Sequence, residues 1–110
     1  MQYSLLVCAA PDHPAAHTAL LTARAVLARH HTLKRLFFFR DGVLNAHTDA
    51  PYYQQWRQLI SQHGIDAVLC VSAAQTRGIA ANSDVLPWTI SGLGQWADAL
   101  HSSDRALSFG

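Results

Sequence analysis

Cys70 is the residue whose type and position most clearly suggest chemistry, and it lies in the stretch DAVLCVSAAQTRG, residues 66–78. An apolar run ends at this cysteine, and small polar residues, an arginine and a glycine follow it. The pattern predicts a strand that ends in Cys70 and a short helix directly after it. At that place, unpaired backbone N–H groups and the positive end of the helix dipole favour a thiolate.

A thiolate is the nucleophile of sulfur chemistry, so Cys70 could carry a transferable sulfur. Ser72 and Arg77 are the candidates to stabilise it, Arg77 if its side chain folds back toward the sulfur. The alternative is a buried thiol that packs as a small hydrophobic residue, which is a common situation for cysteine. Position alone leaves both interpretations open.

The elements that would position Cys70 alternate between strand-like and helix-like segments, with no linker or repeat. Strands are expected at residues 3–9, 33–39, 66–71, 86–90 and 105–109. Helices are expected at about residues 13–30, at 51–64 with Pro51 at its start and Gly64 past its end, at 72–77, and after Ser91 as an N-cap.

This alternation predicts an α/β fold: a single domain over residues 1–110 with a mainly parallel five-stranded sheet and helices on both faces. In such sheets, ligands and reactive groups gather beyond the carboxyl ends of the strands. Cys70 is expected at one of those ends.

Composition narrows the function classes. Half of the 110 residues are apolar and the net charge is +1, which is typical of a globular protein. The absence of a Lys/Arg cluster argues against direct nucleic-acid binding. The start, MQYSLLVCAAPDHP, lacks a basic region and a long apolar run, so neither a signal peptide nor a membrane span is expected. Reduced thiols in the cytoplasm are therefore expected, and a disulfide between Cys8 and Cys70 is disfavoured.

Other chemical groups give weaker signals. Asp12, His13 and His17 show no recognisable metal-ligand pattern, and the SGLG stretch lacks the length and lysine of a phosphate loop, so neither a metal nor a cofactor is expected. Cys8 ends an apolar run and is expected to be a packing residue, so alkylation should label Cys70 ahead of Cys8.

Three tryptophans form a large set for so small a chain: Trp56, Trp88 and Trp96. One or two of them are expected in a subunit interface, where tryptophan is enriched.

Three sequence blocks carry a resemblance to a known family: FFFRDGVLNA at 37–46, QHGIDAVLCVSAAQTRG at 62–78, and TISGLG at 89–94 followed by DRALSF at 104–109. In this order, across nearly the whole chain, they resemble the DsrE/TusD family of sulfur-relay proteins, most closely its TusD branch. The second block is the most specific, because the family's persulfide-carrying cysteine lies in it and matches Cys70.

The resemblance implies a DsrE-like, flavodoxin-like topology and a sulfurtransferase in which Cys70 accepts a sulfane sulfur as a persulfide and passes it on. In the TusD branch the product is the 2-thio group of a tRNA wobble uridine, and in the DsrE branch it is sulfur traffic in sulfur oxidation. A non-catalytic assembly subunit of the same fold is the alternative.

The implied partners are TusB- and TusC-like subunits in a heterohexamer with two copies of each, a TusA-like sulfur donor and a TusE/DsrC-like acceptor. The isolated chain is expected to form homo-oligomers through its apolar patches. The chain departs from the family in two segments, 48–53 and 78–88, which are shorter than is typical, and this affects docking and partner choice.

Overall fold

The computed structural model describes residues 1–110, apart from the side chain of Ser83. Five strands form one sheet in the order β4-β3-β2-β1-β5, and every neighbouring pair is parallel. The strands are β1 (Gln2–Val7), β2 (Thr32–Phe38), β3 (Asp66–Cys70), β4 (Thr89–Ser91) and β5 (Arg105–Phe109). The predicted five-stranded parallel sheet is therefore confirmed.

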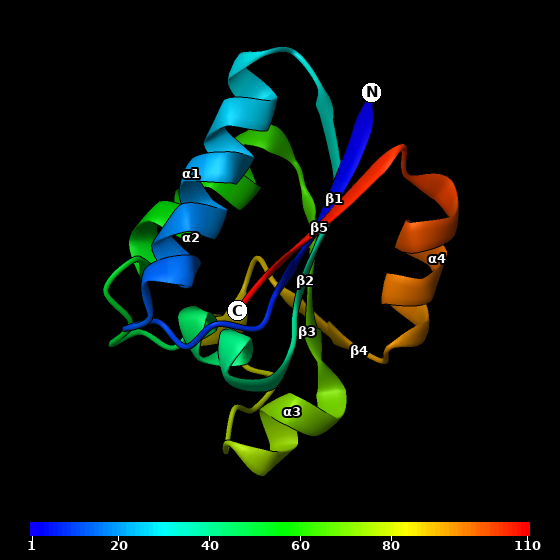
Figure 1. Cartoon of the computed structure of the whole chain (residues 1–110). Helices are drawn as coiled ribbons and strands as arrows, with labels where there is room; N and C mark the ends of the chain where they lie inside the picture. The colour runs from blue at the N-terminus through cyan, green and yellow to red at the C-terminus, as the bar shows by residue number, and fades with distance from the viewer.

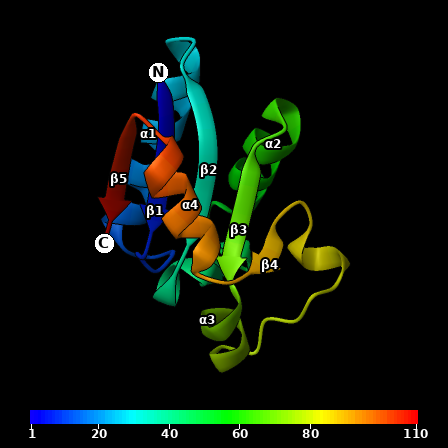
Figure 2. The same cartoon turned by 90° about the vertical axis from the view of Figure 1, so that its right-hand side faces the viewer.

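Helices cover both faces of this sheet. One face carries α1 (Pro14–Ala28) and α2 (Tyr53–His63), and the other carries α4 (Gly94–Ser102) (Figure 1). The short elements η1 (Arg40–Ala46) and α3 (Val71–Thr76) lie at the carboxyl end of the strands, and η2 (Ser83–Val85) belongs to the segment that leads from α3 to β4 (Figures 1 and 2). Within the described residues, a helix with both the length and the apolar character needed to cross a membrane is absent.

The strand order shows where the direction of strand addition reverses in the sheet. From β1 to β4 each new strand is added on one side of the sheet, and β5 then returns to the other side of β1. The chain is doubly wound, although its order differs from the 2-1-3-4-5 order of flavodoxin. The switch point lies between β1 and β5, whereas Cys70 ends β3, two strands away from β1.

Aromatic side chains fill the core on the α2 side of the sheet. The ring of Phe38 packs edge-on against Trp56 at 5.2 Å and against Trp88 at 6.0 Å. Both tryptophans are fully buried, so of the three tryptophans considered for a subunit interface only Trp96 remains a candidate. Trp96 is only partly buried and packs against Phe37 on the α4 side.

The segment before α4 differs from its prediction. The expected strand at 86–90 is observed only as Thr89–Ser91, since Pro87 has no N–H to donate to a sheet and Trp88 donates its N–H to Val85 in a turn. Ser91 is not the N-cap of α4: it ends β4 and pairs in register with Cys70. The helix begins three residues later, at Gly94.

Candidate functional site

Cys70 lies where the sequence places it, at the junction of a strand and a helix. It is the last residue of β3 and the N-cap of α3, with extended backbone angles of φ −61° and ψ 125°. Its neighbour across the sheet is Ser91, the last residue of β4. The helix α3 therefore begins directly after β3 without a loop, and Cys70 lies at the carboxyl edge of the sheet.

The sulfur of Cys70 is buried. The residue is only 1% exposed and belongs to the hydrophobic core cluster. Its Sγ lies 3.4 Å from the hydroxyl Oγ of Ser72, a residue exposed to solvent in the first turn of α3. The site thus combines features of both interpretations, a core thiol with a hydroxyl group beside it.

Among the described residues, the polar contacts of Arg77 do not include the sulfur, so the condition under which it would stabilise the thiolate is not met. Its Nε and Nη2 lie 3.0 and 2.9 Å from Oδ1 of Asp41, and its Nη1 donates to the carbonyl of Ala73 at 3.1 Å. The carboxylate of Asp41 attracts the guanidinium toward η1. Arg77 therefore joins the carboxyl end of α3 to η1, and Ser72 is the only one of the two candidates placed at the sulfur.

The sequence did not predict the element η1, because residues 40–42, RDG, indicate only where the preceding strand ends. Gly42 packs against β1 so closely that a Cβ there would collide with the backbone carbonyl of Val7. The side chain of Asn45 is fully buried, and its Nδ2 donates to the carbonyls of Ala9 and Gly42. These contacts fix η1 against the end of β1 and so position Asp41 for Arg77.

Cys8 follows β1 at the same edge of the sheet and is partly exposed. It lines a cavity of about 600 Å³ at the switch point between β1 and β5, together with Ala9, Ala10, Asp12, His13, Pro14, Asp41 and Gly110. Burial raises the pKa of the Cys8 thiol, and the positive charge of Arg40 opposes part of that increase. The sequence led us to expect Cys8 as a packing residue and Cys70 as the more accessible thiol. The structure shows the opposite order of exposure, because the chain after β1 continues as a loop that leaves Cys8 partly exposed.

The histidines considered for a metal site have separate structural roles. Nδ1 of His13 accepts a hydrogen bond from the N–H of Ala15 and caps α1, whereas His17 stacks on Tyr52 at 4.6 Å. Among the described residues, no group of three His, Cys, Asp or Glu side chains is arranged to hold a metal ion.

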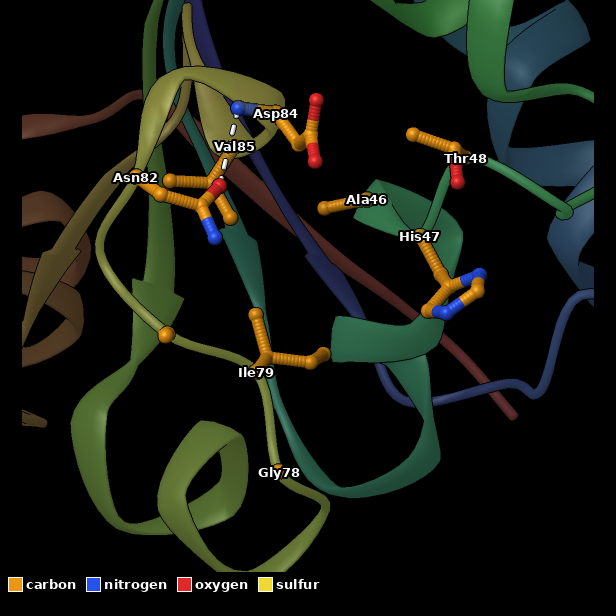
Figure 3. Close-up of a pocket in the computed structure, with 9 residues that line it drawn as sticks. Ala46, His47, Thr48, Gly78, Ile79, Asn82, Asp84 and Val85 are labelled. Carbon is orange, nitrogen blue, oxygen red and sulfur yellow. Dashed lines mark hydrogen bonds between the residues drawn. The ribbon is translucent and has the colours of Figure 1, made fainter.

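A smaller pocket of about 150 Å³ lies between the end of η1, the segment after α3, and η2 (Figure 3). Polar residues on its wall include His47, Thr48, Asn82 and Asp84. The side-chain oxygen of Asn82 accepts a hydrogen bond from the backbone N–H of Asp84 and so caps η2. The pocket belongs to the segment 78–88, which follows the cysteine helix.

A family profile matches nearly the whole chain. The profile of the DsrE/DsrF-like family matches residues 1–109. The chain belongs to this family. Membership agrees with the resemblance carried by the three sequence blocks, and Cys70 with α3 lies within the most specific of them.

Curated relatives of this DsrE/DsrF-like protein are named sulfurtransferases. A sulfurtransferase TusD homolog of Pseudomonas aeruginosa is 35% identical over 128 residues, covering 100% of this chain and 98% of the relative. Sulfurtransferase TusD of Serratia proteamaculans is 39% identical over 112 residues, with 86% and 87% coverage. A DsrE protein of Allochromatium vinosum is 33% identical over 129 residues, with 100% and 99% coverage. These relatives class the chain among the transferases.

The fold also matches that of a solved structure. The ychN protein from E. coli superimposes with a TM-score of 0.83 at 23% identity, over 99% of this chain and 100% of the other.

The alignment with the Pseudomonas relative spans 128 residues, more than the 110 of this chain, so this chain lacks residues that the relative has.

Proposed function

We propose that this protein is a sulfurtransferase subunit of a sulfur relay, in which Cys70 carries the sulfur as a persulfide. The observation that carries the proposal is the position of Cys70 at the β3–α3 junction, inside the sequence block that is most specific to the family. The names of the relatives support the same reaction class.

The proposed reaction consists of two displacements at sulfur. The Cys70 thiolate attacks the outer sulfur of a donor persulfide, the donor S–S bond breaks, and the donor leaves as a thiolate. An acceptor thiolate then attacks the outer sulfur of the Cys70 persulfide, and Cys70 leaves as a thiolate. Each step forms one S–S bond and breaks another, so the pair of steps needs no external oxidant or reductant.

Ser72 and the burial of the site have distinct roles in this proposal. The hydroxyl of Ser72, 3.4 Å from Sγ, donates a hydrogen bond to the thiolate and to the persulfide that replaces it. Burial of Cys70 protects the persulfide from stray thiols, which would otherwise remove the outer sulfur. A donor or acceptor then requires a local opening to reach the sulfur.

We further propose that the relay serves 2-thiolation of a tRNA wobble uridine in the cytoplasm, with a TusA-like donor and a TusE/DsrC-like acceptor. The TusD relatives at 35% and 39% identity support this branch. The DsrE relative at 33% identity supports the alternative, sulfur traffic in sulfur oxidation. Purified TusE-like and DsrC-like acceptors distinguish the two branches by which one removes the sulfur from Cys70.

An oligomer with TusB- and TusC-like subunits, two copies of each chain, is part of the same proposal. Several large apolar side chains are exposed: Leu21, Val71, Leu86, Leu93, Leu100 and Leu107. The edge strand β5 has four exposed residues out of five, which is unusual for a parallel strand. Light scattering of the isolated chain and of a co-expressed set tests the assembly, and a strict monomer in both samples contradicts it.

The experiment that tests the sulfur carrier uses mass spectrometry. The protein is incubated with glutathione persulfide and the adduct, about 32 Da for one sulfur atom, is mapped to its peptide. We expect the adduct on Cys70 in the wild type and in Cys8→Ser, and its loss in Cys70→Ser. In the Cys8→Ser background, where the more exposed thiol cannot react, an adduct that survives Cys70→Ser unchanged contradicts the proposal.

A non-catalytic assembly subunit is the second candidate, and the 1% exposure of Cys70 favours it. In that case Cys70 is a packing residue, and no adduct forms at this site even in the co-expressed complex. Transfer by the complex would then be unaffected by Cys70→Ala.

A further inference from the structure

The connection between α3 and η1 suggests how a buried sulfur becomes accessible. We propose that the Asp41–Arg77 ion pair is a latch that holds α3 beside Cys70 and sets how often the sulfur is exposed. The inference rests on the proposed role of Cys70 and extends it to two residues that position the site without contacting the sulfur.

The neighbours of Cys70 differ in how readily they can move. Behind the sulfur, β3 is paired with β2 on one side and with β4 on the other, so its backbone cannot shift without disrupting the sheet. Beside the sulfur lies α3, whose Ser72 provides the hydroxyl at 3.4 Å. A helix of six residues is too short to be stable by itself, so α3 depends on tertiary contacts.

Two kinds of contact hold α3. Ala73 and Ala74 are buried, and these side chains contribute little apolar area. At the other end, Arg77 binds Asp41 through two nitrogens and the carbonyl of Ala73 through a third. The same guanidinium therefore binds the backbone of α3 at Ala73 and also connects α3 to Asp41 in η1.

The partner in η1 is rigid, which makes the ion pair effective as a latch. Asn45 binds the carbonyls of Ala9 and Gly42, and Gly42 packs on the backbone of Val7. The carboxylate of Asp41 is thus anchored to β1, whereas Arg77 lies on the element that must move. The side chains are 25% exposed for Arg77 and 59% exposed for Asp41, so solvent and salt reach the pair.

The test measures the rate at which iodoacetamide, an uncharged reagent, alkylates Cys70 in a Cys8→Ser background, with the site identified by mass spectrometry. We expect Asp41→Asn and Arg77→Gln each to increase this rate about two- to fivefold, because a pair of this exposure contributes at most about a fivefold change. The charge reversal that combines Asp41→Arg with Arg77→Asp should restore a rate near that of the wild type.

The direction of the two single substitutions separates a latch from a direct electrostatic effect. If Arg77 acted by stabilising the thiolate, Arg77→Gln would slow alkylation while Asp41→Asn would accelerate it. A latch requires both to accelerate it. Opposite directions, or two rates equal to the wild type, overturn the proposal.

A matched control is Asp98→Asn, which removes a carboxylate of similar exposure, 63%, from an ion pair with Arg35 on the α4 side. This variant should leave the Cys70 rate unchanged. Salt provides a test that needs no variant: 1 M NaCl should accelerate alkylation in the wild type and have little effect on Arg77→Gln.

Failure of the latch and failure of the proposed function have different signatures. Unchanged alkylation rates together with a Cys70 persulfide reject the latch and leave the carrier role intact. Faster alkylation without any persulfide rejects the carrier role and leaves the latch as a property of the fold.

Discussion

Two strand ends at the same edge of the sheet carry the two cysteines, and their surroundings are opposite. Cys8 follows β1, is partly exposed and faces a cavity of about 600 Å³. Cys70 ends β3, is buried, and is followed at once by α3. The cysteine placed in the family motif is therefore the protected one, and the cysteine outside it is the open one.

The difference lies in the chain that follows each strand. After β1 the chain runs through a loop that reaches α1 only at Pro14, and this loop leaves the thiol next to open space. After β3 the chain turns directly into a helix whose first turn reaches back to the sulfur. An apolar run that ends in cysteine thus does not reveal whether the sulfur is accessible, since the following residues decide it.

The two thiols are too far apart to form a disulfide. Cys8 directly follows β1 and Cys70 ends β3, and these strands lie on either side of β2, so two strand spacings, roughly 10 Å in total, separate their backbones. A disulfide requires Cα atoms within about 7 Å, so bridging them would need a backbone shift. Both cysteines are free in this structure.

The largest expected effect is the contrast in alkylation itself. In the native isolated chain at pH 8, Cys8 should react with iodoacetamide about a hundredfold faster than Cys70, because Cys70 reacts only through local opening of about 3 kcal/mol. Peptide mapping at a series of reaction times measures the ratio. In denaturant the two rates should converge, and equal rates in the native protein would contradict the contrast.

The next effect concerns η1, which packs against the end of β1 near Cys8 and pairs with α3 near Cys70. Gly42→Ala should destabilise the fold by about 2–3 kcal/mol, since the added Cβ collides with the backbone of Val7. The thermal midpoint should then fall by roughly 10–20 °C, as measured by circular dichroism. Gly92→Ala is the control, because a Cβ there meets nothing within 4 Å. Equal midpoints for the two variants would show that η1 does not depend on this close approach.

A smaller effect is specific to the Cys70 region. Ser72→Ala removes the hydroxyl beside Sγ and should slow persulfide formation about fivefold, which corresponds to about 1 kcal/mol for one hydrogen bond. The exposed Thr76→Ala, at the end of the same helix, is the matched control. Persulfide formation as fast in Ser72→Ala as in the control would remove Ser72 from the proposed mechanism.

The smallest effect is specific to the Cys8 region and depends on pH. Burial raises the pKa of Cys8 and the charge of Arg40 partly opposes this, so the thiol stays protonated to a higher pH than an ordinary cysteine. Arg40→Gln should raise the pKa further and slow alkylation of Cys8 at pH 8 about twofold. Arg40→Lys keeps the charge and should match the wild type. A pH profile measures both, and a reaction as fast or faster in Arg40→Gln would show that the charge of Arg40 does not lower the pKa of this thiol.

The sequence by itself determined the architecture and the place of the candidate site. Apolar runs alternating with amphipathic segments predicted the parallel sheet, because strands buried on both faces must be apolar along their whole length. The strand-to-helix junction at Cys70 and the left-handed Gly64 that ends α2 were also predicted, since both depend on local residue order. The strand predicted at 86–90 failed because Pro87 interrupts hydrogen bonding locally while tertiary pairing extends β4 to Ser91.

Only the tertiary structure decided what surrounds each of these residues. Arg77 pairs with Asp41, which is 36 residues away in the sequence, and Asn45 is bonded to Ala9, also 36 residues away. Both partners come from elements that follow different strands and meet only because the strands are parallel and end at one edge. Local pattern carries no information on such contacts, so the burial of Cys70, the exposure of Cys8 and the joining of α3 to η1 follow from the packing of the folded chain.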